Sequence, residues 1–211
     1  RKAIEELYRW KASADRKPLI VQGARQVGKT WLMKEFAKEA YKKCAYVNFE
    51  DNDMLRQLFE HDFDIQRIIN SIQWTTGVTI DTDTLIVLDE IQEAPRGITA
   101  LKYFQEKAPE YHVMAAGSLL GIAMHHNDSF PVGKVDFMYL YPLSFFEFLE
   151  AVGEKRMVDL LMSKDWQTIT MFRAKFEERL RQYYFVGGMP AVVAAFAEDG
   201  NLERVRTLQN G

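Results

Sequence analysis

The segment Gly23–Thr30 constrains the fold of this chain more than any other. It reads Gly-Ala-Arg-Gln-Val-Gly-Lys-Thr and fits the pattern G-x-x-x-x-G-K-[ST] of a Walker A phosphate loop. The apolar run Pro18–Gln22 comes directly before it, and apolar residues at helical spacing follow it. A phosphate loop requires this order of strand, loop and helix, so the segment predicts a P-loop nucleotide-binding fold.

The residue types of the loop suit the chemistry of a bound triphosphate. Glycines at 23 and 28 let the backbone wrap a phosphate with no Cβ in the way, and the N–H groups then point inward. A helix that begins near Lys29 adds unsatisfied N–H groups and the positive end of its dipole. Lys29 would reach the β- and γ-phosphates, and Thr30 would coordinate Mg²⁺. The predicted nucleotide contacts are Gly23, Ala24, Arg25, Gln26, Val27, Gly28, Lys29, Thr30 and Trp31.

A second motif, Leu85–Glu90, is an apolar run that ends in two acids, as in a Walker B strand. Asp89 is predicted to hold Mg²⁺ together with Thr30, either directly or through water. Glu90 is not needed for metal binding, and a carboxylate at this spacing can polarise a water for attack on the γ-phosphate. The alternative for Glu90 is a solvated acid at the end of a strand. We predict Glu90 and Lys29 as catalytic residues, and Thr30 and Asp89 as the magnesium site.

The choice of nucleotide follows from a tetrapeptide that the chain lacks. Asn-Lys-x-Asp, the sequence that reads guanine, occurs nowhere in the 211 residues. ATP is therefore favoured over GTP, and the two motifs together indicate a P-loop ATPase whose cofactors are ATP and magnesium.

Strands and helices are expected to alternate along residues 1–142. Near-continuous apolar strands are expected at 18–22, 44–49, 85–90, 111–116 and 135–141. Such strands, separated by helical patterns, are typical of a parallel sheet covered on both faces. The pattern changes at Pro142, because Ser144–Glu147 reads as a capping box and only helical periodicity follows it. We predict an α/β three-layer ATPase core at 1–142 and a helical lid subdomain at 143–211.

Composition excludes several classes of protein. Hydrophobic residues make up 47% of the chain, which is ample for a core. The net charge of −3 comes from interspersed acids and bases and offers no electrostatic footprint for nucleic acid. The single cysteine, Cys44, rules out a disulfide framework, and no apolar run approaches the roughly 18 residues of a membrane span. We expect a cytoplasmic protein without membrane association. Helical patterning still runs at Gly211, so we also expect a piece of a longer protein.

Five segments, taken in order, resemble a known family: Gly23–Thr30, Leu88–Gln92, Ala116–Ser118, Tyr141–Phe148 and Gly187–Pro190. The chain is similar to prokaryotic AAA-type ATPases whose members carry a C-terminal domain of unknown function with a restriction-endonuclease-like fold. The resemblance covers nearly the whole chain, and Leu-Ser-Phe-x-Glu-Phe within it is fairly specific to the family. It implies a P-loop NTPase core with a parallel five-stranded sheet in the order 5-1-4-3-2. It also implies that the C-terminal domain would begin beyond Gly211.

The resemblance further implies roles for single residues. Ser118 matches the sensor-1 position, where a polar side chain feels the γ-phosphate, and joins the predicted catalytic residues; the alternative is an ordinary Ser that starts a turn. Asn48 would hydrogen-bond Glu90 and hold it inactive, or it is a buried Asn bonded to backbone. Lys134 stands where the family often has Arg, and it lacks the planar fork that grips a phosphate. An arginine finger would then come from a second subunit or from sequence beyond Gly211.

Three functions are consistent with these patterns. The first is an ATP hydrolase whose turnover drives a conformational change in an attached or partner domain, with self-association as one way to complete the site. The second is an ATP-binding switch or scaffold with little turnover. The third is a nucleic-acid remodelling ATPase, which the charge balance does not favour. We adopt the first as the working hypothesis, and the sequence leaves the partner, the oligomeric state and any effect of nucleic acid open.

Overall fold

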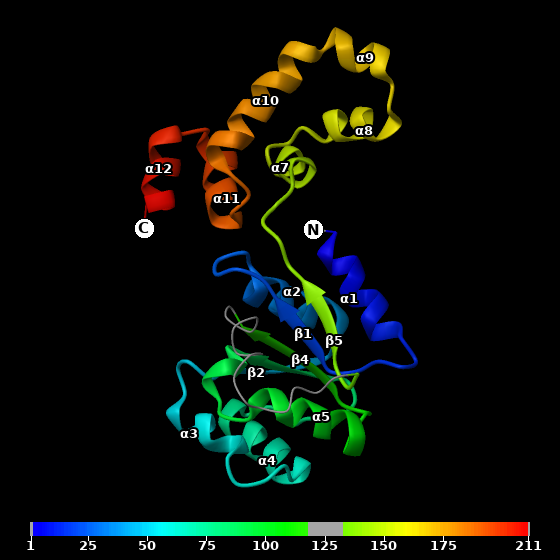
Figure 1. Ribbon diagram of the computed structural model, residues 1–211, viewed down its shortest axis with the longest axis vertical. Coiled ribbons are helices and arrows are strands. Elements are labelled where there is room, and N and C mark those ends of the chain that lie inside the picture. Colours follow the sequence, from blue (N-terminus) through cyan, green and yellow to red (C-terminus); the bar gives the residue numbers. More distant parts are fainter. Residues whose placement is uncertain (1, 118–132, 211) are drawn as a thin grey trace. The chain divides into compact units, whose positions relative to one another are not determined.

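The computed structural model describes residues 2–117 and 133–210 of the chain. The chain divides into two compact units, Arg1–Leu140 and Tyr141–Gly211 (Figure 1). The first unit is a parallel sheet between helices, and the described part of the second is built of helices. Across both described ranges, no helix combines the length and the apolar character needed to cross a membrane.

Five parallel strands form the sheet within the described part of the first unit. They are β1 (Leu19–Gln22), β2 (Lys43–Asn48), β3 (Thr84–Asp89), β4 (His112–Gly117) and β5 (Asp136–Tyr139). Their order, β2-β3-β4-β1-β5, reads 5-1-4-3-2 from the other edge, so the predicted fold is confirmed. β1 lies between β4 and β5 and is buried along its whole length, which explains its continuous apolar run up to Gln22.

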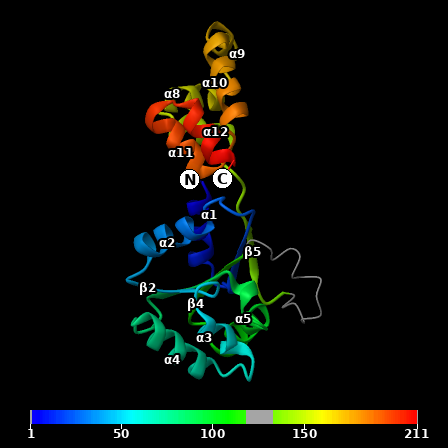
Figure 2. The same ribbon diagram turned by 90° about the vertical axis from the view of Figure 1, so that its left-hand side faces the viewer.

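Helices cover both faces of this sheet (Figures 1 and 2). α1 (Ala3–Ala12) and α2 (Lys29–Ala40) lie on one face, and α4 (Ile65–Thr76) and α5 (Gly97–Lys107) lie on the other. The connections after β2 and β3 contain the short helix α3 (Asp53–Arg56) and the 3₁₀ turns η1 (Gln57–Phe59) and η2 (Ile91–Glu93). The result is a three-layer sandwich in which each apolar face of the sheet is buried under helices.

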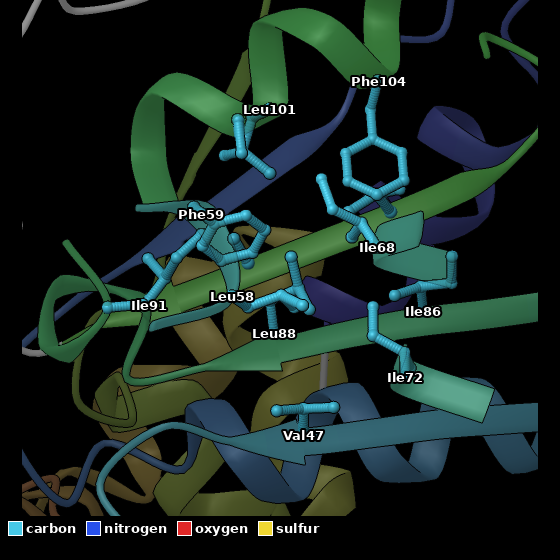
Figure 3. Close-up of a cluster of buried hydrophobic side chains, with 14 of the residues drawn as sticks. Val47, Leu58, Phe59, Ile68, Ile72, Ile86, Leu88, Ile91, Leu101 and Phe104 are labelled. Carbon is cyan, nitrogen blue, oxygen red and sulfur yellow. The ribbon is translucent and has the colours of Figure 1, made fainter. Parts of the chain in front are cut away.

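Alternation along β2 and β3 decides which side chains enter the core beneath α4 and α5. Val47, Ile86 and Leu88 belong to that core (Figure 3). The other residues of this core that Figure 3 labels are each at most 5% exposed: Leu58, Phe59, Ile68, Ile72, Ile91, Leu101 and Phe104. Burial of each such side chain contributes about 1.5–3 kcal/mol. Tyr46 and Asp89 have the opposite parity, so they point to the face that α2 covers.

A half-buried pair of rings joins α1, the end of α2 and β4 at the amino ends of the strands. The Tyr41 hydroxyl lies 2.6 Å from His112 Nδ1, and the two rings meet edge to face with centroids 5.2 Å apart. Trp10 from α1 packs edge-on against the same imidazole. Burial lowers the pKa of His112 to about 4 and raises the pKa of Tyr41, so both rings are neutral near pH 7.

Six helices form the described part of the second unit: α7 (Phe145–Ala151), α8 (Lys155–Ser163), α9 (Trp166–Met171), α10 (Arg173–Val186), α11 (Pro190–Asp199) and α12 (Leu202–Asn210). Ser144 and Glu147 form the capping box that the sequence predicts at the start of α7. Pro190 opens α11, where its missing N–H is not needed. Phe148 and Phe196 stack in the core of this unit with centroids 5.9 Å apart.

Two of the family-like segments, 141–148 and 187–190, meet within the helical unit. The Leu143 N–H donates to the Gly188 carbonyl at 2.6 Å, and the Tyr183 hydroxyl donates to the Leu143 carbonyl at 2.8 Å. A Cβ at Gly188 would lie within 3.0 Å of the Leu143 carbonyl oxygen and of Pro142, a separation that real Cβ atoms essentially never show. Glycine is therefore required at 188 by the close approach of two backbone segments.

We expect Gly188→Ala to lower the free energy of unfolding by about 2–3 kcal/mol, because a backbone oxygen cannot move aside as a flexible side chain can. Gly200→Ala, in the same unit, is the matched control. Gly200 ends α11 at φ 66° with open space where a Cβ would lie. The cost of alanine there is therefore only that of holding a Cβ-bearing residue in the left-handed conformation, about 1 kcal/mol. Urea unfolding followed by circular dichroism measures both variants. Equal losses would contradict the backbone contact as the constraint at 188.

Candidate nucleotide-binding site

The loop 23–28 joins the carboxyl end of β1 to α2. Gly28 is the N-cap of α2 with φ 89°, and Gln26 has φ 64°, so the backbone enters the left-handed region twice. Glycine adopts such a φ without the cost that a Cβ imposes. The first N–H groups of α2 have no partner inside the helix, and they adjoin this tight loop. A helix N-terminus that follows such a loop is an anion-binding arrangement.

Gly23 is also constrained by the neighbouring strand. The Leu140 N–H, directly after β5, donates to the Gln22 carbonyl at 2.7 Å. A Cβ at Gly23 would collide with the Leu140 carbonyl oxygen. Two constraints therefore favour glycine at position 23. One is room for a phosphate, and the other is the close approach of the backbone at the end of β5.

Lys29 is the buried cation of the loop. Its ammonium donates to the carbonyls of Gly23 and Ala24 at 3.0 and 2.9 Å, and the residue is 6% exposed. Burial lowers the pKa of Lys29, and the nearby carboxylates of Glu90 and Asp89 act in the opposite direction. The ammonium is thus held against the loop by neutral acceptors, which a phosphate with a formal negative charge can replace.

Thr30 and Asp89 bring the two sequence motifs together. The Thr30 hydroxyl donates to Asp89 Oδ2 at 2.7 Å, although the residues are 59 positions apart. The Tyr46 hydroxyl donates to the same oxygen at 2.9 Å, and the Glu90 N–H donates to Oδ1 at 3.1 Å. Asp89 is 2% exposed, and these bonds supply the donors that a buried carboxylate needs.

Glu90 follows β3 with φ 50° and ψ 46°, a conformation that a residue with a side chain rarely adopts. Strained backbone of this kind concentrates at functional sites. The Gln92 amide donates to Glu90 Oε2 at 2.5 Å. Asn48, expected to restrain Glu90, instead donates to Asp51 at 2.7 Å and accepts from the Glu50 N–H at 3.0 Å.

Lys134 lies at the other end of the sheet. It precedes β5, and the parallel register places Asp136 beside Leu19 at the start of β1, whereas the loop leaves β1 after Gln22. Lys134 forms an ion pair with Glu106 at 3.1 Å. It therefore cannot substitute for an arginine finger on the loop of its own chain.

The remaining predicted residues divide by exposure. Val27 is buried, while Ala24, Arg25, Gln26 and Trp31 are exposed. The exposed residues are accessible to a ligand, and Val27 instead packs the loop onto the core. Ser118 lies outside the residues that the structure describes.

The donor set suits a magnesium nucleotide. A hydroxyl and a carboxylate, oxygen ligands of the kind that Mg²⁺ prefers, meet at Thr30 and Asp89. The Lys29 ammonium and the N-terminus of α2 supply positive charge beside them. Over residues 2–117 and 133–210, no group of three or more His, Cys, Asp or Glu side chains could hold a metal.

Tyr46 is the member of this site that sequence analysis does not identify. Its link to Asp89 depends on the pairing of β2 with β3, in which Asn48 lies opposite Asp89 and Tyr46 opposite Val87. No local motif marks that register. The signal available in the sequence was the alternation of side chains along a strand. Tyr46 lies two residues before Asn48, so the two side chains must share one face of the sheet.

Comparison with known proteins identifies related folds. A family model described as an AAA domain matches residues 15–149. The Walker-type ATPase PABY2304 of Pyrococcus abyssi has a TM-score of 0.56 at 16% identity, over 98% of this chain and 69% of that one. Drosophila ORC bound to DNA has a TM-score of 0.54 at 13% identity, over 99% of this chain and 60% of that one. No curated protein matches the sequence significantly. At such identities the solved structures show a shared fold, and each is longer than this chain.

We expect Lys29→Ala to weaken ATP binding by roughly 100-fold or more, because a charge-assisted contact worth up to about 3 kcal/mol is lost. Lys38→Ala removes an exposed lysine from the last turn of the same helix and serves as the control. Calorimetric titration with ATP measures both affinities. An unchanged affinity in Lys29→Ala would refute the assignment of the loop as the phosphate site.

Proposed function

We propose that this chain, which belongs to the AAA-domain family, hydrolyses ATP with Mg²⁺ and uses the turnover to drive a conformational change in an attached or partner domain. One observation carries the proposal. The Thr30 hydroxyl donates to Asp89 Oδ2 at 2.7 Å, beside the loop whose carbonyl groups hold the buried Lys29 ammonium. Binding groups for a triphosphate and for its cation are thus adjacent.

Each residue would have a distinct part in hydrolysis. Lys29 and the N-terminus of α2 would bind the β- and γ-phosphates. Thr30 and Asp89 would hold Mg²⁺, which when bound neutralises charge on the phosphate oxygens. Glu90 would orient the attacking water and accept its proton as the bond between the γ-phosphorus and the leaving ADP oxygen breaks. The strained backbone at Glu90 supports this role.

The contact at Gly23 supports coupling to a conformational change. The first residue of the loop is in backbone contact with Leu140, and Tyr141 is the first residue of the helical unit. A shift of the loop upon nucleotide binding would therefore act on the connection that leads into that unit. Such coupling requires differential binding to the two conformations.

The alternative functions differ in the step after ATP binding. A switch or scaffold would bind ATP with the same residues but turn it over slowly whatever partner is added. A remodelling ATPase would be stimulated by nucleic acid; Drosophila ORC is bound to DNA, whereas this chain has a net charge of −3. An ATPase assay with and without DNA, across protein concentrations, separates these functions and also tests self-association.

We expect Glu90→Gln to retain Mg²⁺-dependent ATP binding and to cut hydrolysis by roughly 100-fold or more, because a general base is removed. Asp89→Asn should instead reduce the enhancement of ATP affinity by Mg²⁺, because it removes the negative charge of a proposed metal ligand. Calorimetry and phosphate release distinguish the two variants. Loss of ATP binding in Glu90→Gln would show that Glu90 is a metal-binding or structural acid.

We expect the 1–211 chain to bind ATP but to turn it over below about 0.1 per second, against about 10 per second for a typical enzyme. Lys134, the residue aligned with the family's arginine, lies at the far end of the sheet, and a missing arginine finger costs on the order of 10³–10⁵ in rate. Lys134→Ala should leave the rate unchanged. Turnover of several per second, independent of protein concentration, would contradict the need for an added cation.

A further inference from the structure

Tyr46 lies between two charged groups beside the candidate site. Its hydroxyl, reaching across from β2, donates to Asp89 Oδ2 at 2.9 Å. On its ring face, the Lys34 ammonium of α2 lies 3.8 Å from the ring centroid. The ring is half-buried and Lys34 is exposed, so the ring itself is partly shielded from water while the ammonium above it remains open to solvent. Tyr46 thus connects β2, α2 and the carboxylate at the end of β3.

Three donors restrain the Asp89 carboxylate. Thr30 and Tyr46 both donate to Oδ2, and the Glu90 N–H donates to Oδ1. Donors on both oxygens oppose rotation of the carboxylate about its bond to Cβ, since rotation would lengthen every one of these bonds. Of the three donors, Tyr46 alone belongs to neither sequence motif.

We infer that Tyr46 is a positioning residue that holds Asp89 in the orientation in which it and Thr30 can serve one Mg²⁺ ion. The inference rests on the proposed function. Lys34 keeps the ring in place, and the hydroxyl keeps Oδ2 directed toward Thr30. Without the hydroxyl, Asp89 would retain Thr30 as a partner, but its carboxylate would be freer to turn. The oxygens of Asp89 and Thr30 would then have to be ordered when the metal binds.

Packing alone does not account for this tyrosine. A phenylalanine would fill the same space and would still offer its ring face to Lys34. The hydroxyl adds a hydrogen bond to a charged acceptor, a stronger class of bond than one between neutral groups. The feature specific to tyrosine is therefore its bond to the proposed metal ligand.

The test is the Mg²⁺ dependence of ATP binding, measured by calorimetry in EDTA and over a range of Mg²⁺ concentrations. In Tyr46→Phe we expect the affinity in EDTA to change less than about twofold, and the Mg²⁺ concentration for half-maximal enhancement to rise about tenfold, as expected for one lost bond to a charged group. Tyr41→Phe is the matched control. It removes a hydroxyl bonded to His112 at the other end of the sheet, so its Mg²⁺ dependence should match the wild type.

A second variant covers the case in which Tyr46→Phe does not fold. Lys34→Gln keeps the tyrosine hydroxyl but removes the cation above the ring, so we expect a smaller shift in the same direction. Wild-type Mg²⁺ dependence in the folded Tyr46→Phe variant, or in Lys34→Gln if that variant alone folds, would overturn the inference. An equal shift in Tyr41→Phe, or a comparable loss of affinity in EDTA, would also overturn it by indicating a structural effect. A wild-type chain that binds no ATP would instead refute the proposed function itself.

Discussion

The buried carboxylate of Asp89 is the group on which the arrangement of the candidate site depends. A charge that is 2% exposed is tolerated only with hydrogen bonds and opposite charge nearby. Thr30, Tyr46 and the Glu90 N–H supply the bonds, and Lys29 supplies the charge. These groups come from the start of α2, from β2 and from the end of β3. The hydrogen bonds to this one carboxylate therefore depend both on the register in which β2 pairs with β3 and on where α2 begins.

Close backbone contacts secure both ends of the connection between the two units. Gly23 abuts the carbonyl of Leu140 within the first unit, and Gly188 abuts the carbonyl of Leu143 within the second. Hydrogen bonds accompany each contact, from Leu140 to Gln22 and from Leu143 to Gly188. The connection is thus short and anchored in each unit.

Prediction from the sequence succeeds where one local pattern dictates a contact, and it fails where several polar partners compete for one side chain or where strands must pair. The capping box at Ser144 needs four consecutive residues, and the structure contains it. Asn48 has the nearby Asp51 and Glu50 as hydrogen-bond partners, and these short-range bonds displace the expected one to Glu90. The place of Lys134 could have been deduced, because a residue before a parallel strand lies at the edge opposite a loop that follows one.

The sequence by itself determined the alternation of strands and helices and the two motifs, because apolar periodicity and short spacings are properties of neighbouring residues. The order of the strands came from resemblance and agrees with the structure. Tertiary structure alone decided that Thr30 and Tyr46 share one oxygen of Asp89, that Gly23 is required by Leu140, and that Gly188 is required by Leu143. These contacts join segments distant in sequence, and their geometry exists only once the strands have paired and the helices have packed.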